Sequence, residues 1–216
     1  MSETAALTLA ERIDPKTTAL IVVDVQNDFC HSDSPLAKNN DMSLVQDMVP
    51  RLLQLIDAAR AAGTTIIWIK VLHFEWTTSA AGTEHRARTR PNSQMICQEG
   101  TFGAEFYRVE PEAGEPIVVK HRYSAFVDTD LQLILRSKGI KSVIMTGVAT
   151  NVCVESTARD AYMRDYYVTF VSDCSGTFTQ DKHDATLRNM ADHFGVVATS
   201  DEIIEAWSKV PSLAHS

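Results

Sequence analysis

The sequence predicts an α/β fold: a doubly wound parallel sheet of about six strands between two layers of helices. Two observations carry this prediction. Short apolar runs rich in β-branched residues alternate along the chain with segments whose apolar residues recur every three or four positions. The runs lack the alternation of a half-exposed strand, so helices are expected to cover both faces of the sheet. Strands that alternate with helices form right-handed βαβ units and therefore a parallel sheet.

The first half of the chain contains two predicted strands and one predicted helix. Residues 18–25 (TALIVVDV) and 65–71 (TIIWIKV) are continuous apolar runs. The helix between them has apolar residues at spacings of three and four, with Pro50 in its first turn and Gly63 as its stop. Residues 72–114, called the excursion below, show no sustained periodicity. An irregular segment of this length more often carries a function than serves only as a connection.

The second half supplies the remaining elements. Four further apolar runs predict strands, at residues 116–120, 142–145, 166–171 and 195–198. Four segments predict helices because a capping residue opens them or a glycine closes them, at residues 129–138, 151–165, 181–194 and 201–207.

The composition predicts one domain over residues 1–216, with a lead-in at 1–17 and a frayed tail at 208–216. The chain is 44% hydrophobic, which suffices for a sizeable core, and its four cysteines are expected to be thiols. The net charge of -8 offers no basic surface to nucleic acid or to an anionic membrane. No apolar run approaches the roughly 20 residues of a membrane helix, and no signal peptide is apparent, so a cytoplasmic protein is expected.

Three chemically active side chains stand at the ends of predicted strands. Asp24 ends the first strand, Lys120 ends the third, and Cys153 follows the fourth. Ligands of open parallel sheets bind at the carboxyl ends of the strands, so the three are expected to meet there. A thiol in the first turn of a helix is favoured as a thiolate. The alternatives are a solvated turn aspartate, an edge lysine and a small core thiol.

Other kinds of site find little support. Neither the dinucleotide-binding nor the P-loop glycine pattern occurs, and the histidines include no H-E-x-x-H. His73, Glu75 and His85 are the only grouping that resembles a metal site. No cofactor and no metal are therefore expected.

Three segments resemble the signature segments of the isochorismatase-like cysteine hydrolases. They are residues 21–29 (IVVDVQNDF), 118–126 (VVKHRYSAF) and 146–161 (TGVATNVCVESTARDA), and VTFVSDC at 168–174 also fits. Their order and spacing match from about residue 18 to residue 207.

The resemblance implies roles for several of these residues. Cys153 would be the nucleophile, Asp24 the general base, and Lys120 the cation that holds the pair together. A cis peptide would join Val148 to Ala149, and the N–H groups of Ala149 and Cys153 would form the oxyanion hole. Because the cysteine is present, the resemblance implies a hydrolase of C–N bonds.

Within that family, the segments around Arg122 and Cys153 resemble ureidoacrylate amidohydrolases and enzymes of N-carbamoyl compounds. The Asp-x-His pair of the metal-dependent nicotinamidases is missing from residues 71–76 (VLHFEW). We therefore expect a cysteine-dependent amidohydrolase that cleaves a small ureido, N-carbamoyl or linear amide substrate through a thioester. The candidate substrate-binding residues are Gln26, Phe29, Trp76, Arg122, Tyr123 and Asn151.

Two alternatives remain open. One is a metal-assisted amidase of the nicotinamidase type that uses His73, Glu75 and His85. The other is a catalytically silent family member that acts as an interaction protein.

The expected partner is a small-molecule substrate, with neither nucleic acid nor membrane. A homo-oligomer, dimer or tetramer, is also expected, both from the resemblance and from the aromatic residues of the excursion.

Overall fold

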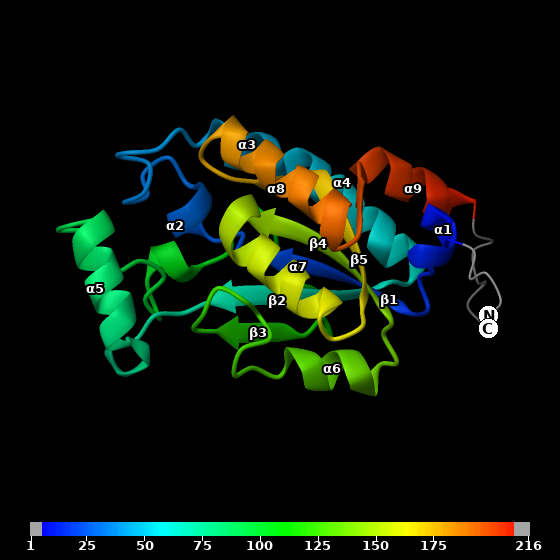
Figure 1. Ribbon diagram of the computed structural model, residues 1–216, viewed down its shortest axis with the longest axis horizontal. Coiled ribbons are helices and arrows are strands. Elements are labelled where there is room, and N and C mark those ends of the chain that lie inside the picture. Colours follow the sequence, from blue (N-terminus) through cyan, green and yellow to red (C-terminus); the bar gives the residue numbers. More distant parts are fainter. Residues whose placement is uncertain (1–5, 210–216) are drawn as a thin grey trace.

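A single sheet of six parallel strands forms the centre of the computed structural model, which describes residues 6–209 (Figure 1). The strand order is β3-β2-β1-β4-β5-β6, and every neighbouring pair is parallel. The prediction of a doubly wound parallel sheet is confirmed. The strands are β1 (Thr18–Val23), β2 (Thr65–Val71), β3 (Ile117–Lys120), β4 (Ser142–Val148), β5 (Tyr167–Gly176) and β6 (Val196–Ala198).

The order of the strands decides where a site can form. The chain winds from β1 outward to β2 and β3, then returns to place β4 on the other side of β1. The carboxyl ends of β1 and β4, where the winding reverses, are the usual ligand position in such sheets. Asp24 follows β1 directly, and Cys153 lies just beyond the end of β4.

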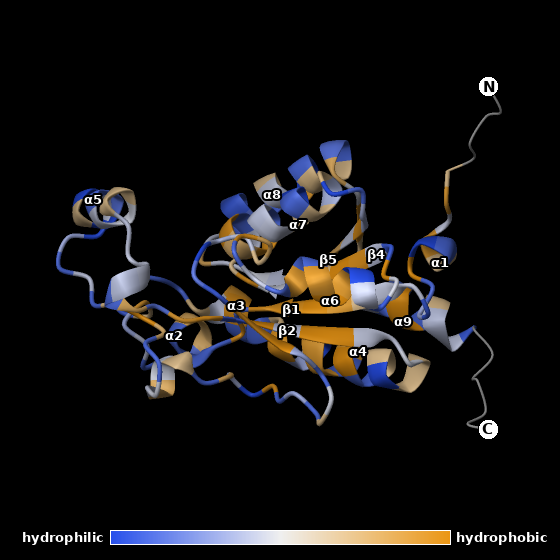
Figure 2. Ribbon diagram, turned by 90° about the horizontal axis from the view of Figure 1, so that it is seen from below, coloured by the Kyte–Doolittle hydropathy of each residue, from blue (hydrophilic) through white to orange (hydrophobic). Residues whose placement is uncertain are grey.

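Helices cover both faces of the sheet (Figure 2). The long helix α4 (Val49–Ala62) packs against α9 (Ser200–Ser208) on one face. Helices α6 (Leu131–Ser137), α7 (Glu155–Tyr162) and α8 (Gln180–His193) cover the other face. Within residues 6–209, no helix has both the length and the apolar character that would let it cross a membrane.

Each face has its own apolar core because the strand side chains point alternately to the two sides. Leu20 and Val22 of β1 join the core beneath α4, whereas Ile21 and Val23 join the core beneath α6 and α7. All six residues of β1 are buried, as its continuous apolar run predicts. The four cysteines are buried free thiols, also as predicted.

Four short helices were not predicted from the sequence: α1 (Leu9–Arg12), α2 (Asn27–Cys30), α3 (Ser43–Asp47) and α5 (Ala80–Thr89). Helix α5 projects from the body (Figure 1) and buries none of its residues completely, so it has no apolar stripe to reveal it. The predicted lead-in therefore contains a helical turn. Residues 1–5 of that lead-in and residues 210–216 of the predicted tail lie outside the described residues.

Two strands also continue further than predicted. β4 extends through Gly147 to Val148, and β5 extends to Gly176. Gly147 has a φ of +110° and pairs with Val23 of β1. A Cβ added to Gly147 would lie 2.0 Å from the carbonyl oxygen of Val23, so the residue permits a close approach of the two central strands.

This close approach predicts a large effect of Gly147→Ala. The new Cβ would collide with backbone that the central ladder holds in place, so we expect the free energy of unfolding to fall by about 2–4 kcal/mol. For a chain of this length, the melting temperature should fall by roughly 5–12 °C. Gly63→Ala is the matched control, because Gly63 also has a positive φ, +73°, but a Cβ there meets nothing within 4 Å. Equal losses in the two variants would contradict the steric argument.

Candidate active site

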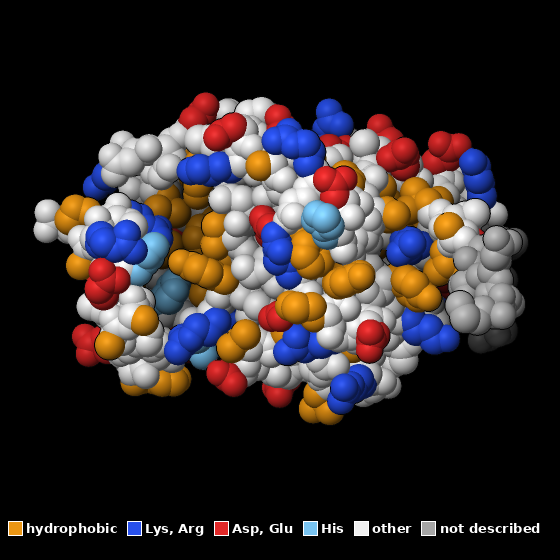
Figure 3. Space-filling view, viewed as in Figure 1, with side chains coloured by type: hydrophobic (Ala, Val, Ile, Leu, Met, Phe, Trp, Pro, Cys, Tyr) orange, Lys and Arg blue, Asp and Glu red, His pale blue; other side chains and the backbone are white. Residues whose placement is uncertain are grey.

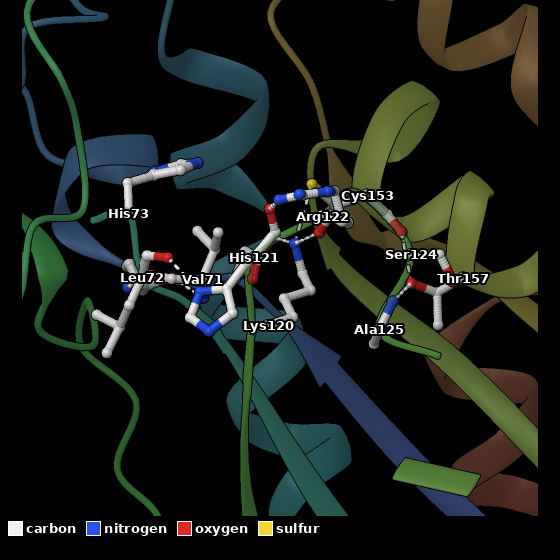
Figure 4. A network of polar contacts seen from close by, with 12 residues as sticks. Val71, Leu72, His73, Lys120, His121, Arg122, Ser124, Ala125, Cys153 and Thr157 are labelled. Carbon is white, nitrogen blue, oxygen red and sulfur yellow. Dashed lines mark hydrogen bonds and ion pairs between the residues drawn. The ribbon is translucent and has the colours of Figure 1, made fainter. Parts of the chain in front are cut away.

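The structure brings Asp24, Lys120 and Cys153 together at the carboxyl edge of the sheet. Nζ of Lys120 lies 2.7 Å from Oδ2 of Asp24 and 3.5 Å from Sγ of Cys153. The Asp24 and Lys120 side chains are completely buried, and Cys153 is only 6% exposed. Figure 4 shows Lys120 and Cys153 converging from β3 and from the segment that follows β4. A carboxylate, an ammonium group and a thiol therefore meet at one buried site.

Asp24 is fixed by its backbone. Its φ of +50° is a left-handed value, uncommon for a residue other than glycine, and its N–H donates to the carbonyl oxygen of Ile69 in β2. The carboxylate is held by the charge of Lys120, and neither of its oxygens accepts a well-oriented hydrogen bond from residues 6–209. A proton from the thiol can therefore be accepted there.

Lys120 is the last residue of β3, where alternating burial turns its side chain inward while Val119 faces outward. Its ammonium group also donates to the carbonyl oxygen of Arg122 at 3.0 Å. The ammonium group therefore makes two hydrogen bonds, to this carbonyl and to the sulfur, and one ion pair, to the carboxylate. The lysine is thus held rigidly between its partners.

Cys153 lies in a π-helical turn, Thr150–Val154, rather than in the first turn of the predicted α-helix. The turn leads directly into α7, and such π turns often occur at functional sites. Thr157 anchors it: its hydroxyl donates to the carbonyl oxygen of Cys153 at 2.7 Å and accepts from the N–H of Ala125 at 3.0 Å. This threonine, absent from the sequence prediction, ties the cysteine turn to the loop after Lys120.

The predicted cis peptide joins Val148 to Ala149 in the structure. The carbonyl oxygen of Ala149 accepts from the N–H groups of Val152 and Val154, at 3.0 and 3.3 Å. Those two N–H groups flank the N–H of Cys153. The oxyanion site built from the N–H groups of Ala149 and Cys153 stays a prediction.

Burial dominates the electrostatics of the site. It raises the pKa of the Cys153 thiol to about 12, although the charge of Lys120 opposes this rise. Burial likewise raises the pKa of Asp24, again against the effect of Lys120. For Lys120, burial alone would lower the pKa, but its interactions with Asp24 and Cys153 together outweigh burial and the net shift is upward. The upward shift at Cys153 opposes the thiolate expected from the helix start and favours a thiol that keeps its proton until a base removes it.

Of the predicted substrate-binding residues, Gln26 has a structural role instead. Its amide nitrogen donates to the carbonyl oxygens of Val71 and Ala104, at 3.1 and 2.9 Å. Its amide oxygen accepts from the N–H of Val71 at 2.9 Å, and no part of the residue is exposed. Because these hydrogen bonds engage every polar group of its side chain, Gln26 joins the end of β2 to the excursion. No polar group of Gln26 is left to bind a substrate.

The other five predicted residues lie in different settings. Trp76 is 77% exposed and stacks on Phe74, while Tyr123 is 55% exposed. Arg122 donates to the backbone oxygens of Thr77 and His121. Phe29 packs partly buried against the core, and the side chain of Asn151 accepts from Thr177 at 2.7 Å. Among residues 6–209, none of these five side chains forms a hydrogen bond with the sulfur of Cys153.

His73 is a neighbour of the site that the sequence indicated only as a metal ligand. Its Nδ1 lies 3.0 Å from the carbonyl oxygen of Ile96. Burial lowers its pKa, so the imidazole is neutral at physiological pH. Its charge interactions with Asp24 and Lys120 show that it lies near the buried pair.

The residues of the metal-assisted alternative do not assemble into a site. Across residues 6–209, no group of three or more His, Cys, Asp or Glu side chains has the arrangement of a metal centre. His85 is exposed on α5, where its Nδ1 lies 3.2 Å from Arg88. His73, Glu75 and His85 therefore do not fit a metal ion.

Comparison with known proteins gives concordant results. The family model of the isochorismatase domain matches residues 18–202. The ureidoacrylate amidohydrolase RutB of Enterobacter sp. (strain 638) is 35% identical over 215 residues, which cover 93% of each chain. A solved N-carbamoylsarcosine amidase from Thermoplasma acidophilum is 27% identical, with a TM-score of 0.70, over 86% of this chain and 97% of that one.

A solved nicotinamidase, PncA from Bacillus subtilis, is also similar: it is 26% identical, with a TM-score of 0.72, over 84% of this chain and 99% of that one. The fold thus serves more than one substrate among these neighbours. The matched domain spans the sheet from β1 to the start of α9, with all three converging side chains inside it. The resemblance read from the sequence is confirmed, and the chain belongs to the isochorismatase family of hydrolases.

Proposed function

We propose that this hydrolase is a cysteine amidohydrolase that cleaves a C–N bond in a small ureido, N-carbamoyl or linear amide substrate. The observation that carries the proposal is the buried contact of Lys120 with both Asp24 and Cys153. A binding protein gains nothing from burying a charged pair beside a thiol, because desolvation makes such a pair costly. An enzyme gains a base and a nucleophile that meet in a fixed geometry.

In the first half of the reaction, Asp24 takes the proton of Cys153 as the sulfur attacks the carbonyl carbon. A raised pKa makes the buried carboxylate a stronger base than a solvated aspartate, which suits it to this transfer. The positive charge of Lys120 stabilises the negative charge that develops on the sulfur as its proton leaves. The substrate oxygen becomes negative and is bound by the N–H groups of Ala149 and Cys153.

The tetrahedral intermediate then collapses. The C–N bond breaks, the leaving nitrogen receives the proton from Asp24, and a thioester joins Cys153 to the acyl group. In the second half, Asp24 takes a proton from water, whose oxygen attacks the thioester carbon. The C–S bond breaks, and the sulfur regains its proton from Asp24. Cys153 and Asp24 thus return to their starting states without any other reactant than water.

The substrate class rests on the relatives. Two of the proteins to which the chain is similar are named for ureidoacrylate and N-carbamoylsarcosine, and both compounds contain a carbamoyl nitrogen. The nicotinamidase neighbour keeps nicotinamide as a second candidate, and its solved structure covers nearly as much of this chain. The metal-assisted form of that activity is disfavoured by the scattered positions of His73, Glu75 and His85.

A substrate panel tests the proposal. We expect ammonia release from at least one of ureidoacrylate, an N-carbamoyl amino acid and biuret, with turnover of nicotinamide at least about 100-fold slower. Assays with and without EDTA separate the metal-assisted mechanism, because full activity in EDTA is expected. Cys153→Ala serves as the blank. Preference for nicotinamide would overturn the substrate class, and failure to hydrolyse any amide would favour a catalytically silent protein.

A further inference from the structure

The backbone pairing around Cys153 decides where its sulfur lies. Cys153 belongs to the π-helical turn Thr150–Val154, which we call the cysteine turn. The N–H of Glu155 reaches back five residues to the carbonyl oxygen of Thr150, whereas an α-helix reaches back four. Relaxation to α-helical pairing would rotate the residues before Glu155 by about 100° and shift them by about 1.5 Å relative to α7. The sulfur would then lose its position beside the buried ion pair.

A π-helical turn is rare without support, so the side chains that hold this one are informative. Thr157 of α7 donates to the carbonyl oxygen of Cys153 at 2.7 Å. After β5, the hydroxyl of Thr177 donates to the side-chain oxygen of Asn151 at 2.7 Å. These two contacts hold the middle and the end of the cysteine turn. Its first residue, Thr150, on which the π-helical pairing closes, needs a contact of its own.

That contact comes from His183 of α8. Nδ1 of His183 lies 3.0 Å from Oγ1 of Thr150, and in either tautomer of the ring the two atoms can share a proton in a hydrogen bond. Thr150 has no exposed surface, and His183 is only 9% exposed. Burial lowers the pKa of His183, although the charge of Asp184 and the backbone of Ser172 oppose this effect. The imidazole is therefore neutral at physiological pH, and the contact is a buried hydrogen bond between uncharged groups.

Packing between α8 and α7 is incomplete, which makes this hydrogen bond more important. A hollow of about 380 Å³ lies between the two helices, and Asn151 of the cysteine turn also lines it. Figure 3 views the molecule from the side of α7 and α8, where basic and acidic side chains stand close together. The carboxylate of Glu155 crosses to α8 and accepts from Thr186 at 2.7 Å and from Asn189 at 3.1 Å. Directional polar contacts therefore join α8 to the cysteine turn and to α7.

We propose that His183 is a positioning residue: through Thr150 it holds the cysteine turn in its π-helical pairing and so keeps the sulfur of Cys153 beside Asp24 and Lys120. The inference rests on the proposed amidohydrolase function and adds to it a residue that acts only through the turn. An apolar contact at the same place would fill the space without fixing the direction of the Thr150 side chain. The hydrogen bond is therefore needed for the geometry of the nucleophile more than for the stability of the fold.

Kinetics of single variants give the first test. Thr150→Val removes the hydroxyl and keeps the shape of the side chain. We expect kcat for the best substrate to fall about 10- to 100-fold with KM changed less than about threefold, because misplacement of a reacting group by about 1 Å has a cost of this size. His183→Leu should cause a similar loss, whereas Thr150→Ser and His183→Asn, which keep a polar atom at the contact, should recover most of the activity.

Thr186→Val is the matched control for these variants. It also removes a buried threonine hydroxyl from the contacts of α8, but the partner of that hydroxyl lies outside the cysteine turn. Its kcat should stay within about threefold of the wild type. An equal loss of kcat in Thr186→Val and Thr150→Val would show that any weakening of the α8 contacts has this effect, and would overturn the specific role of His183.

The double variant Thr150→Val/His183→Leu separates positioning from stability. Each single variant leaves a buried polar group without its partner and should lower the melting temperature by roughly 3–8 °C. The double variant removes both partners and should recover most of this loss. Its kcat should nevertheless remain as low as in the single variants. Recovery of kcat together with the melting temperature would overturn the positioning role.

Hydrogen exchange tests the turn without any turnover. We expect the backbone N–H groups of Val154 and Glu155 to exchange at least about tenfold faster in Thr150→Val and in His183→Leu than in the wild type and in Thr186→Val, because relaxation of the turn breaks their bonds. Mass spectrometry of peptides that cover residues 149–157 measures the rate. Faster exchange in a protein that hydrolyses no amide would overturn the proposed function but keep the role of His183 in the turn. Unchanged exchange would overturn that role.

Discussion

Cys153→Ala is expected to abolish turnover, with kcat at least about 10⁴-fold lower, while the fold is retained. The reason is that the sulfur forms the bond to the substrate, and no other thiol can replace it. Cys30, Cys97 and Cys174 are buried, and burial raises the pKa of each above its ordinary value. Steady-state ammonia release from the best substrate measures the loss.

Retention of the fold is checked on the same sample. The loss of one buried sulfur atom should lower the free energy of unfolding by only about 1 kcal/mol. Cys97→Ala is the control, because it removes a thiol of similar burial and should leave kcat within about threefold of the wild type. Acid-quenched wild type should also show a mass increase equal to the acyl group, which Cys153→Ala should lack. Substantial activity in Cys153→Ala would exclude the thioester mechanism.

The sheet was predictable because its central strands are buried on both faces. Residues 65–71 were predicted as a strand and are β2 with the same bounds, since an uninterrupted apolar run has no other stable position in this fold. The meeting of Asp24 with Lys120 followed from the rule that parallel strands place their carboxyl ends at one edge. Simple topology, applied to three strand ends, thus located the candidate site.

Features set by packing were not predictable in this way. Helix α5 escaped notice because its residues are exposed, and an exposed helix has no apolar period. The predicted strand at residues 142–145 stopped short of Gly147, but the missing side chain of this glycine lets β4 continue and pass close to β1. A single sequence shows that a glycine is present without showing whether a turn or a close contact requires it.

The protonation state of the thiol also depended on three-dimensional packing. Proximity to a helix start suggested a thiolate, yet burial outweighs this effect and raises the pKa of Cys153 to about 12. Gln26 was assigned to substrate binding as a polar side chain able to hydrogen-bond a ureido or carboxylate group. In the structure its amide is hydrogen-bonded to backbone groups of β2 and of the excursion.

Lys120→Met is the second variant with a large expected effect, because it leaves the Asp24 carboxylate buried without its partner. Lys120 and Asp24 are both completely buried, and their contact is 2.7 Å. Removal of one partner from a buried pair costs about 3–5 kcal/mol of the free energy of unfolding. Activity should fall by at least about 10³-fold, since the base loses its charge partner and the pKa of Cys153 rises further.

The double variant Asp24→Asn/Lys120→Met completes the comparison. It removes both charges and keeps the shapes of the side chains approximately, so the energetic penalty of an unpaired buried charge disappears. We expect it to recover most of the stability lost in Lys120→Met while remaining inactive. Denaturant unfolding of the wild type, both single variants and the double variant yields the coupling energy. A coupling energy near zero would contradict the buried ion pair.

The pH dependence of Lys120→Met provides the sharpest check of this pair. Burial raises the pKa of Asp24 and the charge of Lys120 opposes that rise, so removing the lysine raises the pKa further. A carboxyl group whose pKa is higher in the folded than in the unfolded state keeps its proton longer when folded. The folded variant therefore binds more protons than the unfolded chain above the usual aspartate range, and its stability falls as pH increases. We expect the deficit of Lys120→Met relative to the wild type to be larger at about pH 8 than at about pH 5, and to lose this dependence when Asp24→Asn is added. A deficit that is constant over this range, or that grows toward acid, would place the unpaired charge somewhere other than Asp24.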